Sequence, residues 1–391
     1  GNTALVSEDN GATWISYMMP VASAATQWWK VIWCPTQNYF MAIQGGTVTS
    51  TLVAYSTNGK DWSTVTTNPA TAIYQAIAFD NSQATYKWMA ISGGSAASTV
   101  SSRASITNGS VVFGAPATTQ IASAQWIDLA TNGAGRWVAI AGGSAVGTAT
   151  AYSTTGDVWT AGGTNASSLW QSVAYGNGTF CAVSSSATNG PTACSADAVA
   201  WTAGTAPTLP TGMSYNKVIY TGTAFVLLAG PTPLTTGAPA AAQASQIYVV
   251  STSNTATSIT WGAIKYLPDY THWISMGNNG NEVGIVSTQT GKFAYTADIT
   301  ATTPTWTLTS GVFPVWNRLS VYSQTQEYTT ALATAANVST TKDSTTATCT
   351  STAQMQVGSV MFLTLGNVVA NGAVYWQAGT VGTHVSAVII T

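Results

Sequence analysis

Few side chains in this sequence could carry acid–base chemistry, and two glutamates are the first candidates. Glycoside hydrolysis uses two carboxyl groups that flank one bond. Glu282 and Glu327 each lie in a short polar turn between two apolar segments, so the two turns could meet at one face of the fold. Solvated turn carboxylates are the favoured interpretation, because such turns are normally exposed. We therefore predict no catalytic residue and no enzymatic activity.

Nucleophilic and metal chemistry are also weakly supported. His272 and His384 are the only histidines, and neither has a G-x-S-x-G motif or a cysteine partner near it. The four cysteines lack the paired C-x-x-C spacing of a zinc site, so we predict no metal and no cofactor. Cys181 and Cys194 fall on adjacent predicted strands, where a disulfide and two buried thiols are both possible.

The composition restricts the partners of the chain. Only 6% of the 391 residues are charged and the net charge is −2, against roughly 25% charged residues in an average globular protein. Three arginines and seven lysines are too few to line a groove that follows phosphates, so nucleic acid is not an expected partner. No apolar run approaches the ~20 residues of a membrane-spanning helix, so membrane insertion is not expected either.

A short polar turn that ends in tryptophan recurs along the chain. Its clearest copies are SEDNGATW (7–14), STNGKDW (56–62), STTGDVW (153–159) and SADAVAW (195–201), and Trp261 and Trp306 continue the series. One further copy, SITNGSV (105–111), has valine in place of tryptophan. Asn-Gly and Asp-Asn-Gly accept the positive φ of a tight turn. The seven copies therefore predict seven hairpin turns.

A second repeat precedes most of these turns. It consists of an alternating apolar strand, a polar turn and another apolar strand. Seven segments show it: 29–46, 74–94, 126–143, 170–186, 215–230, 273–287 and 316–333. A third strand such as LVAYS (52–56) follows, and the tryptophan lies on a fourth. Four antiparallel strands repeated in this way are typical of a β-propeller.

The two ends of the repeat complement each other. Residues 3–14 supply only a third and a fourth strand, and residues 316–333 supply only a first and a second. We therefore predict an all-β, seven-bladed β-propeller over residues 1–335, closed by N-terminal strands that complete the last blade. Residues 336–391 do not fit the repeat, and they predict a small C-terminal β appendage that serves docking or oligomerisation.

The turn resembles the Asp-box, or BNR, repeat, because SEDNGATW matches the pattern S-x-D-x-G-x-x-W in full. The resemblance covers the predicted propeller and implies a structural role for Asp9, Trp14, Asn58, Trp62, Trp159 and Trp201. Similar repeats occur in sialidases, glycan-binding propellers, receptors and assembly factors. A sialidase needs three convergent arginines and has six blades. Arg103, Arg136 and Arg318 occupy unlike strand positions, so we do not expect this activity.

Aromatic residues open the first strand of every predicted blade: Trp29, Tyr74, Trp126, Trp170, Tyr215, Trp273 and Trp316. The favoured interpretation is that these rings wedge between adjacent blades. The alternative is a ring of aromatic faces, near one end of the central channel, that stacks on sugars. Trp28 and Trp33 have no place in the repeat, and they are therefore the better ligand candidates.

The composition, rich in Thr, Ser, Ala and Gly, resembles that of phage tail-fibre and other virion surface proteins. We therefore expect a non-catalytic protein of a bacteriophage particle that binds a host cell-surface glycan or receptor. Its location would be the virion surface or the extracellular space, with other virion proteins held through the appendage and a possible homo-oligomer. The alternatives are a purely structural decoration or adaptor protein, and a secreted glycan-binding protein or sialidase-like glycoside hydrolase.

Overall fold

The structure is a computed structural model. It describes residues 3–309, with gaps at 10, 21–27, 35–37, 66, 84, 95, 108–109, 114–116, 118, 143–148, 164–167, 186–190, 211–212, 232–246, 256, 269–272 and 288–291, and further on 338–340, 347–349, 360–362 and 387–389. The chain divides into two compact units, Gly1–Ser323 and Gln324–Thr391. The secondary structure of the described residues consists of strands, and no helix among them is long and apolar enough to span a membrane.

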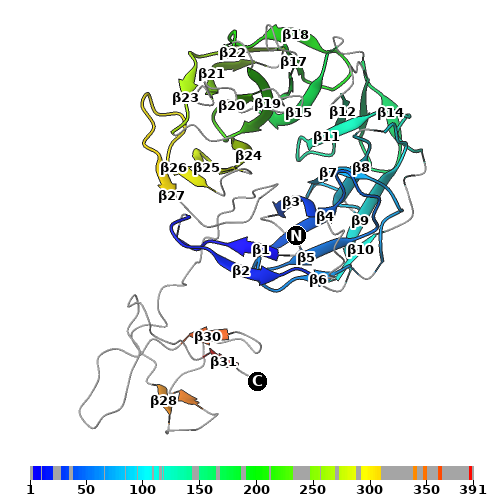
Figure 1. Ribbon diagram of the computed structural model, residues 1–391. Coiled ribbons are helices and arrows are strands. Elements are labelled where there is room, and N and C mark those ends of the chain that lie inside the picture. Colours follow the sequence, from blue (N-terminus) through cyan, green and yellow to red (C-terminus); the bar gives the residue numbers. More distant parts are fainter. Residues whose placement is uncertain are drawn as a thin grey trace. The chain divides into compact units, whose positions relative to one another are not determined.

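Six antiparallel sheets, each built on four consecutive strands, are arranged radially as the blades of a β-propeller (Figure 1). The first two blades are β3 (Trp28–Cys34), β4 (Tyr39–Gln44), β5 (Val53–Ser56) and β6 (Ser63–Thr64), then β7 (Tyr74–Phe79), β8 (Trp88–Ser92), β9 (Ser101–Thr107) and β10 (Ser110–Phe113). The third and fourth are β11 (Trp126–Thr131), β12 (Trp137–Ala141), β13 (Thr150–Ser153) and β14 (Trp159–Ala161), then β15 (Trp170–Gly176), β16 (Thr179–Ser184), β17 (Pro191–Ser195) and β18 (Thr202–Thr205). The fifth and sixth are β19 (Met213–Tyr220), β20 (Phe225–Pro231), β21 (Ile247–Thr255) and β22 (Ser258–Trp261), with β23 (Lys265–Tyr266) paired to β21, then β24 (Trp273–Asn279), β25 (Glu282–Ser287), β26 (Phe293–Thr296) and β27 (Thr307–Thr309).

The prediction of seven blades is wrong, because the described residues of the propeller form six. The N-terminal turn joins β1 (Thr3–Val6) to β2 (Ile15–Met18), and these strands form a sheet of only two strands. A turn that ends in tryptophan requires the two strands that it connects, whereas a blade has four. The number of turns can therefore exceed the number of blades. The inner strands predicted at 316–333 lie outside the described residues.

The β1–β2 hairpin contacts both the first and the sixth blade. On one side Lys60 Nζ lies 2.5 Å from Glu8 Oε1. On the other side Thr309 donates a hydrogen bond of 2.7 Å to the carbonyl of Gly11, and the ring of Trp14 meets that of Phe293 edge-on at 5.1 Å. The hairpin thus links the first and last blades of the ring, as Figure 1 shows between β6 and β27.

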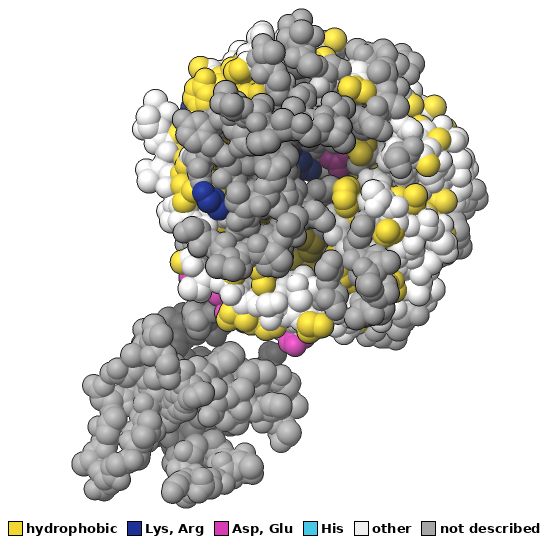
Figure 2. Space-filling view, viewed as in Figure 1, with side chains coloured by type: hydrophobic (Ala, Val, Ile, Leu, Met, Phe, Trp, Pro, Cys, Tyr) yellow, Lys and Arg dark blue, Asp and Glu magenta, His cyan; other side chains and the backbone are white. Residues whose placement is uncertain are grey.

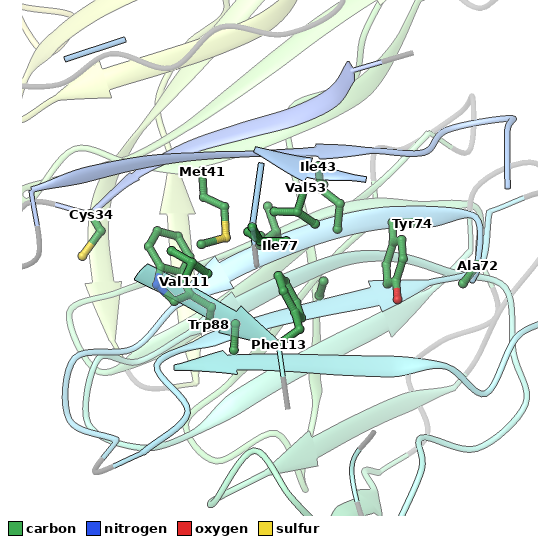
Figure 3. Close-up of a cluster of buried hydrophobic side chains, with 13 residues drawn as sticks. Cys34, Met41, Ile43, Val53, Ala72, Tyr74, Ile77, Trp88, Val111 and Phe113 are labelled. Atoms are coloured by element: carbon green, nitrogen blue, oxygen red, sulfur yellow. The ribbon is translucent and has the colours of Figure 1, made fainter. Parts of the chain in front are cut away.

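The core consists of apolar layers between neighbouring blades. In β4, alternate residues point to opposite faces of the sheet, so Met41 and Ile43 face the second blade while Ala42 faces the N-terminal hairpin. Trp88 and Phe113 of the second blade complete the first of these layers (Figure 3). The period-two pattern of the sequence therefore builds two interfaces from each inner hairpin.

A glycine pair at the end of the second strand brings the next blade close. Gly46 donates a hydrogen bond of 2.9 Å to the carbonyl of Tyr74, and Gly94 donates one of 2.8 Å to the carbonyl of Trp126. A Cβ atom on Gly45 would lie 2.0 Å from the same Tyr74 oxygen. These positions therefore require glycine for the close approach of two backbones.

The C-terminal unit contains two described antiparallel pairs. They are β28 (Val338–Thr340) with β29 (Ala347–Cys349), and β30 (Val360–Phe362) with β31 (Ala387–Ile389). Strands therefore form within the predicted C-terminal region. The compact unit starts at Gln324, and a domain boundary after residue 335 stays a prediction.

Candidate functional site

The inner strand of every blade has a shift of register at its start, of the kind produced by a β-bulge. The residues just before the shift are aromatic: Trp28, Tyr74, Trp126, Trp170, Tyr215 and Trp273. The residues just after it are of four types: Lys30, Ala76, Asp128, Ser172, Lys217 and Ser275. The register thus gives the aromatic position of the first blade to Trp28, one residue before the Trp29 that the sequence pattern selected.

Three of these variable positions meet around one carboxylate. Lys30 Nζ lies 2.5 Å from Asp128 Oδ1, and Lys217 Nζ lies 3.6 Å from Asp128 Oδ2. The three residues belong to the first, third and fifth blades, so their inner strands can meet only at the central channel. Figure 2 shows cationic and acidic side chains together in the hollow at the middle of the propeller face.

Asp128 is held from several directions. Its Oδ2 accepts hydrogen bonds from Ser172 Oγ at 2.9 Å and from the backbone N–H of Val173 at 3.2 Å. Burial alone would raise the pKa of Asp128, but the ammonium groups of Lys217 and Lys30 outweigh it and hold the pKa well below its usual range. The carboxylate is therefore ionised and fully engaged, which makes it a poor general base and a poor nucleophile.

A cavity of about 470 Å³ opens beside this cluster. The inner strands of the first five blades line it, and the β7–β8 and β11–β12 turns contribute Asn81 and Gly133. One part of the wall is charged, with Lys30, Asp128 and Lys217. The rest is largely apolar and includes the aromatic rings of Trp33 and Phe79. The cavity thus combines apolar walls with a few polar groups, the usual composition of a small-molecule site.

The predicted ligand-binding aromatics separate into three groups. Five are completely buried and pack between blades: Tyr74, Trp126, Trp170, Tyr215 and Trp273. Trp28, Trp29 and Trp33 are partly buried, and of these only Trp33 lines the cavity. Trp316 lies outside the described residues.

The repeated turns have a common geometry in which side chains hold backbone amides. Ser7 Oγ accepts a hydrogen bond of 2.7 Å from the N–H of Gly11, and Asp9 Oδ1 accepts one of 2.8 Å from Thr13. The indole of Trp14 then donates to the carbonyl of Gly11 at 3.0 Å. The turn at 56–62 repeats these contacts with Ser56, Asn58, Gly59 and Trp62, and the turn at 195–201 repeats them with Ser195, Asp197, Ala198 and Trp201. In the turn at 153–159, Ser153 Oγ accepts a hydrogen bond from the N–H of Gly156, and Trp159 is buried.

The described arginines do not converge on the channel. Arg103 on β9 pairs with Asp157 of the next blade and lies over the ring of Tyr86. Arg136 lies over the ring of Tyr152 and donates to the carbonyl of Asp197. Both side chains therefore bridge neighbouring blades. Arg318 lies outside the described residues.

The other candidates for chemistry are dispersed. Glu282 accepts hydrogen bonds of 3.0 Å from Tyr295 and Asn279, whereas Glu327, His272 and His384 lie outside the described residues. Cys181 and Cys194 face each other across β16 and β17 as free thiols. Among the described residues, no three His, Cys, Asp or Glu side chains are grouped so that they could hold a metal ion.

The sequence search did not select Lys30, Asp128 and Lys217, although a signal for them exists. Each follows an aromatic residue by two positions, in WWK, WID and YNK. Because only 6% of the residues are charged, a charged residue two positions after an aromatic one is unusual, and this pattern distinguishes three of the inner strands. Because a bulge lies between the aromatic and the charged residue in each of these strands, the three charged residues occupy the same position on the channel.

Comparison with known proteins finds distant likenesses among solved structures. No family model matches the chain, and no curated protein matches it. Among solved structures, YCF48 bound to D1 peptide is 13% identical (TM-score 0.49, covering 79% of this chain and 84% of that one). A catalytically inactive virginiamycin B lyase from Staphylococcus aureus with quinupristin is 10% identical (TM-score 0.49; 73% and 92%). The Aleuria aurantia lectin with alpha-methyl-L-fucoside is 11% identical (TM-score 0.44; 73% and 93%). The propeller assignment rests on the strand order of this chain itself.

Proposed function

We propose that this chain is a non-catalytic ligand-binding propeller that holds a glycan in the channel cavity. The observation that supports the proposal is the lining of that cavity, where Trp33 and Phe79 lie close to two lysines and Asn81. Aromatic faces stack on the apolar side of a sugar ring, while amide and ammonium groups bind its oxygens. The carboxylate of Asp128 is already engaged by protein groups, which favours binding over catalysis.

The setting that we propose is the surface of a bacteriophage particle, where the propeller would bind a host cell-surface glycan and the C-terminal unit would hold other virion proteins. The support for this setting is the composition, which combines few charges with many small neutral polar residues. Labelling particles with an antibody to the propeller, followed by electron microscopy, tests the setting separately from ligand binding.

The test of binding is a glycan array with the purified full chain. The informative variant is Trp33→Leu, which keeps apolar volume in the cavity and removes the flat stacking face. The matched control is Tyr266→Leu, because Tyr266 on β23 is 61% exposed and does not line the cavity. We expect the Trp33 variant to bind about tenfold more weakly and the control to bind like the wild type.

Two results would contradict the proposal. One is the absence of binding to any glycan, which would leave a structural platform as the better account. The other is binding that both variants keep unchanged, which would place the glycan elsewhere on the chain. Thermal unfolding of each variant must show that it is folded before the arrays are compared.

A further inference from the structure

Cysteine is rare in this chain, and two of its four copies lie directly opposite each other. Cys181 on β16 pairs with Cys194 on β17, the second and third strands of the fourth blade. Cys181 is completely buried and Cys194 is 2% exposed. The corresponding pairs of the other blades contain no cysteine: Met41 and Tyr55, Met89 and Arg103, Val138 and Tyr152, Val226 and Val250, and Gly284 and Tyr295.

The geometry of a directly opposed pair suits a disulfide. Opposite residues of antiparallel strands have Cα atoms about 4.5 or 5.5 Å apart and side chains on the same face of the sheet, and disulfides join Cα atoms about 4.4–6.8 Å apart. The thiol of Cys181 donates a hydrogen bond to the sulfur of Cys194. The two sulfur atoms therefore lie in contact, and a bond between them requires no change in the strand register.

The two thiols differ in how readily they ionise. The hydrogen bond from Cys181 lowers the pKa of Cys194 and outweighs the effect of its burial, and the backbone N–H of Ile259 on β22 adds to the lowering. Burial raises the pKa of Cys181 well above its usual range. Because the thiolate is the reactive form of cysteine, Cys194 is the sulfur that reacts first with an oxidant.

The pair lies beneath the outer strands of two blades. Cys194 is opposite Thr202 on β18, the outermost strand of the fourth blade, and all four residues of β18 are exposed. Ile259 belongs to β22, an outer strand of the fifth blade. Exposed strands with few buried contacts open locally at low cost in free energy. A small oxidant can therefore reach Cys194 from the rim of the propeller, away from the channel cavity, which neither cysteine lines.

We propose that Cys181 and Cys194 form an oxidation site, at which hydrogen peroxide converts the two thiols into a disulfide across the fourth blade. The sulfur of Cys194 attacks one peroxide oxygen, and the O–O bond breaks to give a sulfenic acid and one water. The sulfur of Cys181 then attacks the sulfenic sulfur, and the S–O bond breaks to release a second water. The two sulfurs lose two electrons, the peroxide gains them, and both thiol protons end in water.

The disulfide would stabilise the propeller without altering its channel. It closes a loop between β16 and β17, which restricts the unfolded chain, and an oxidising environment outside the cell favours it. We expect oxidation to raise the temperature of unfolding by about 5 °C and a dithiol reductant to reverse the rise. This inference does not depend on the proposed glycan binding.

The experiment treats the folded full chain with hydrogen peroxide and maps the cysteines over time. The remaining thiols are alkylated under denaturing conditions, the chain is digested, and the peptides are identified by mass spectrometry. Cys34 is the internal control, because it is also completely buried but lies opposite Tyr39. We expect the peptides of Cys181 and Cys194 to become linked about tenfold sooner than Cys34 is oxidised.

Three variants test the order of the two steps. Cys181→Ala should stop at the sulfenic acid of Cys194, which dimedone traps. Cys194→Ala should leave Cys181 as a thiol over the same time. Cys34→Ala is the matched control, because it also removes one buried thiol, and it should form the linkage at the rate of the wild type.

Several results would overturn the proposal. One is a linkage that forms in urea but never in the folded chain, and another is oxidation of Cys34 before the pair. Sulfenic acid on Cys181 in Cys194→Ala, with none on Cys194 in Cys181→Ala, would contradict the assigned order. An unchanged temperature of unfolding after full linkage would contradict the stabilising role. The mapping uses no glycan, so its outcome is independent of the glycan array.

Discussion

The turns that end in tryptophan and the inner-strand positions after the bulge are both repeated around the ring, but they differ in what they conserve. The turns at 7–14, 56–62, 153–159 and 195–201 each keep a serine whose Oγ accepts a hydrogen bond from a backbone N–H of the turn, as Ser7 does from Gly11 and Ser56 does from Gly59. The positions after the bulge keep only their place and vary from alanine to lysine and aspartate. Repetition of chemistry therefore marks the parts that build the fold, and variation at a repeated place marks the parts that form a site.

Lys30 in the channel and Lys60 near the N-terminal hairpin form ion pairs of equal length in very different surroundings. Lys30 and Lys60 each lie 2.5 Å from a carboxylate, but Asp128 is 5% exposed and Glu8 is 63% exposed. We expect Lys30→Met to lower the free energy of unfolding by about 3 kcal/mol or more, because it leaves a buried carboxylate undercompensated. Lys60→Met should cost less than about 1 kcal/mol.

Urea unfolding of the full chain, followed by tryptophan fluorescence, measures both values. Equal losses in the two variants would mean that the channel pair is no more important for stability than a surface pair, and the distinction between the two regions would lose its energetic support.

The second prediction compares alanine substitutions at two turn glycines that both have a positive φ but differ in how closely they are packed. Gly11 has φ of 84° and Gly133 has φ of 66°. A Cβ atom on Gly11 would lie 2.0 Å from the ring of Phe293, whereas a Cβ on Gly133 meets nothing within 4 Å. Gly133→Ala should therefore cost about 1 kcal/mol from backbone strain alone, and Gly11→Ala should cost a further 1–3 kcal/mol, roughly, for the clash.

Thermal unfolding of the two alanine variants provides the measurement. If Gly11→Ala is no worse than Gly133→Ala, then the contact between the N-terminal hairpin and the sixth blade contributes little to stability.

The third and smallest effect concerns pH. The pKa of Asp128 is lower in the folded protein than in the unfolded chain, where it is about 3.9. The unfolded state therefore takes up the proton first. The stabilisation by the ion pair is complete above about pH 5 and is lost as the pH falls through about 4 towards the folded pKa, with a slope of at most about 1.4 kcal/mol per pH unit.

Asp9, Asp197 and Asp298 also have lowered pKa values, caused mainly by hydrogen bonds within their turns, so they add slopes of the same sign. Asp128→Asn isolates the contribution of the channel. Its unfolding free energy should vary less steeply with pH between about 5 and 2 than that of the wild type, and an unchanged slope would contradict the assignment of the low pKa to Asp128.

The local structure could be predicted well from the sequence. Residues 29–46 and 126–143 read as inner hairpins because their apolar residues alternate, and β3–β4 and β11–β12 form there. The positive φ of the turns could be predicted where glycine occupies the position, as at Gly11 and Gly59, and the turn at 195–201 has a positive φ at Ala198 instead. These features depend on neighbours in sequence, so a single segment contains the information.

The blade count and the site could not be predicted in the same way. A turn specifies two strands and leaves open whether two more join them, so the N-terminal turn suggested a blade that is only a hairpin. Lys30 and Asp128 are separated by 98 residues, and no local spacing connects them. Their meeting depends on the closure of the ring, and a search for short catalytic motifs did not detect it.

The bond between Thr309 and Gly11 spans 298 residues, and this has a consequence for the order in which the protein can fold. During synthesis the N-terminal hairpin leaves the ribosome before the six blades, yet its partner β27 is the last strand of the sixth blade to be made. Earlier blades can fold as units as they emerge, while the hairpin waits with one side uncovered. The last step of folding is therefore a long-range docking that carries a high loop-closure cost, and a chain stalled before residue 309 would expose that side to other chains.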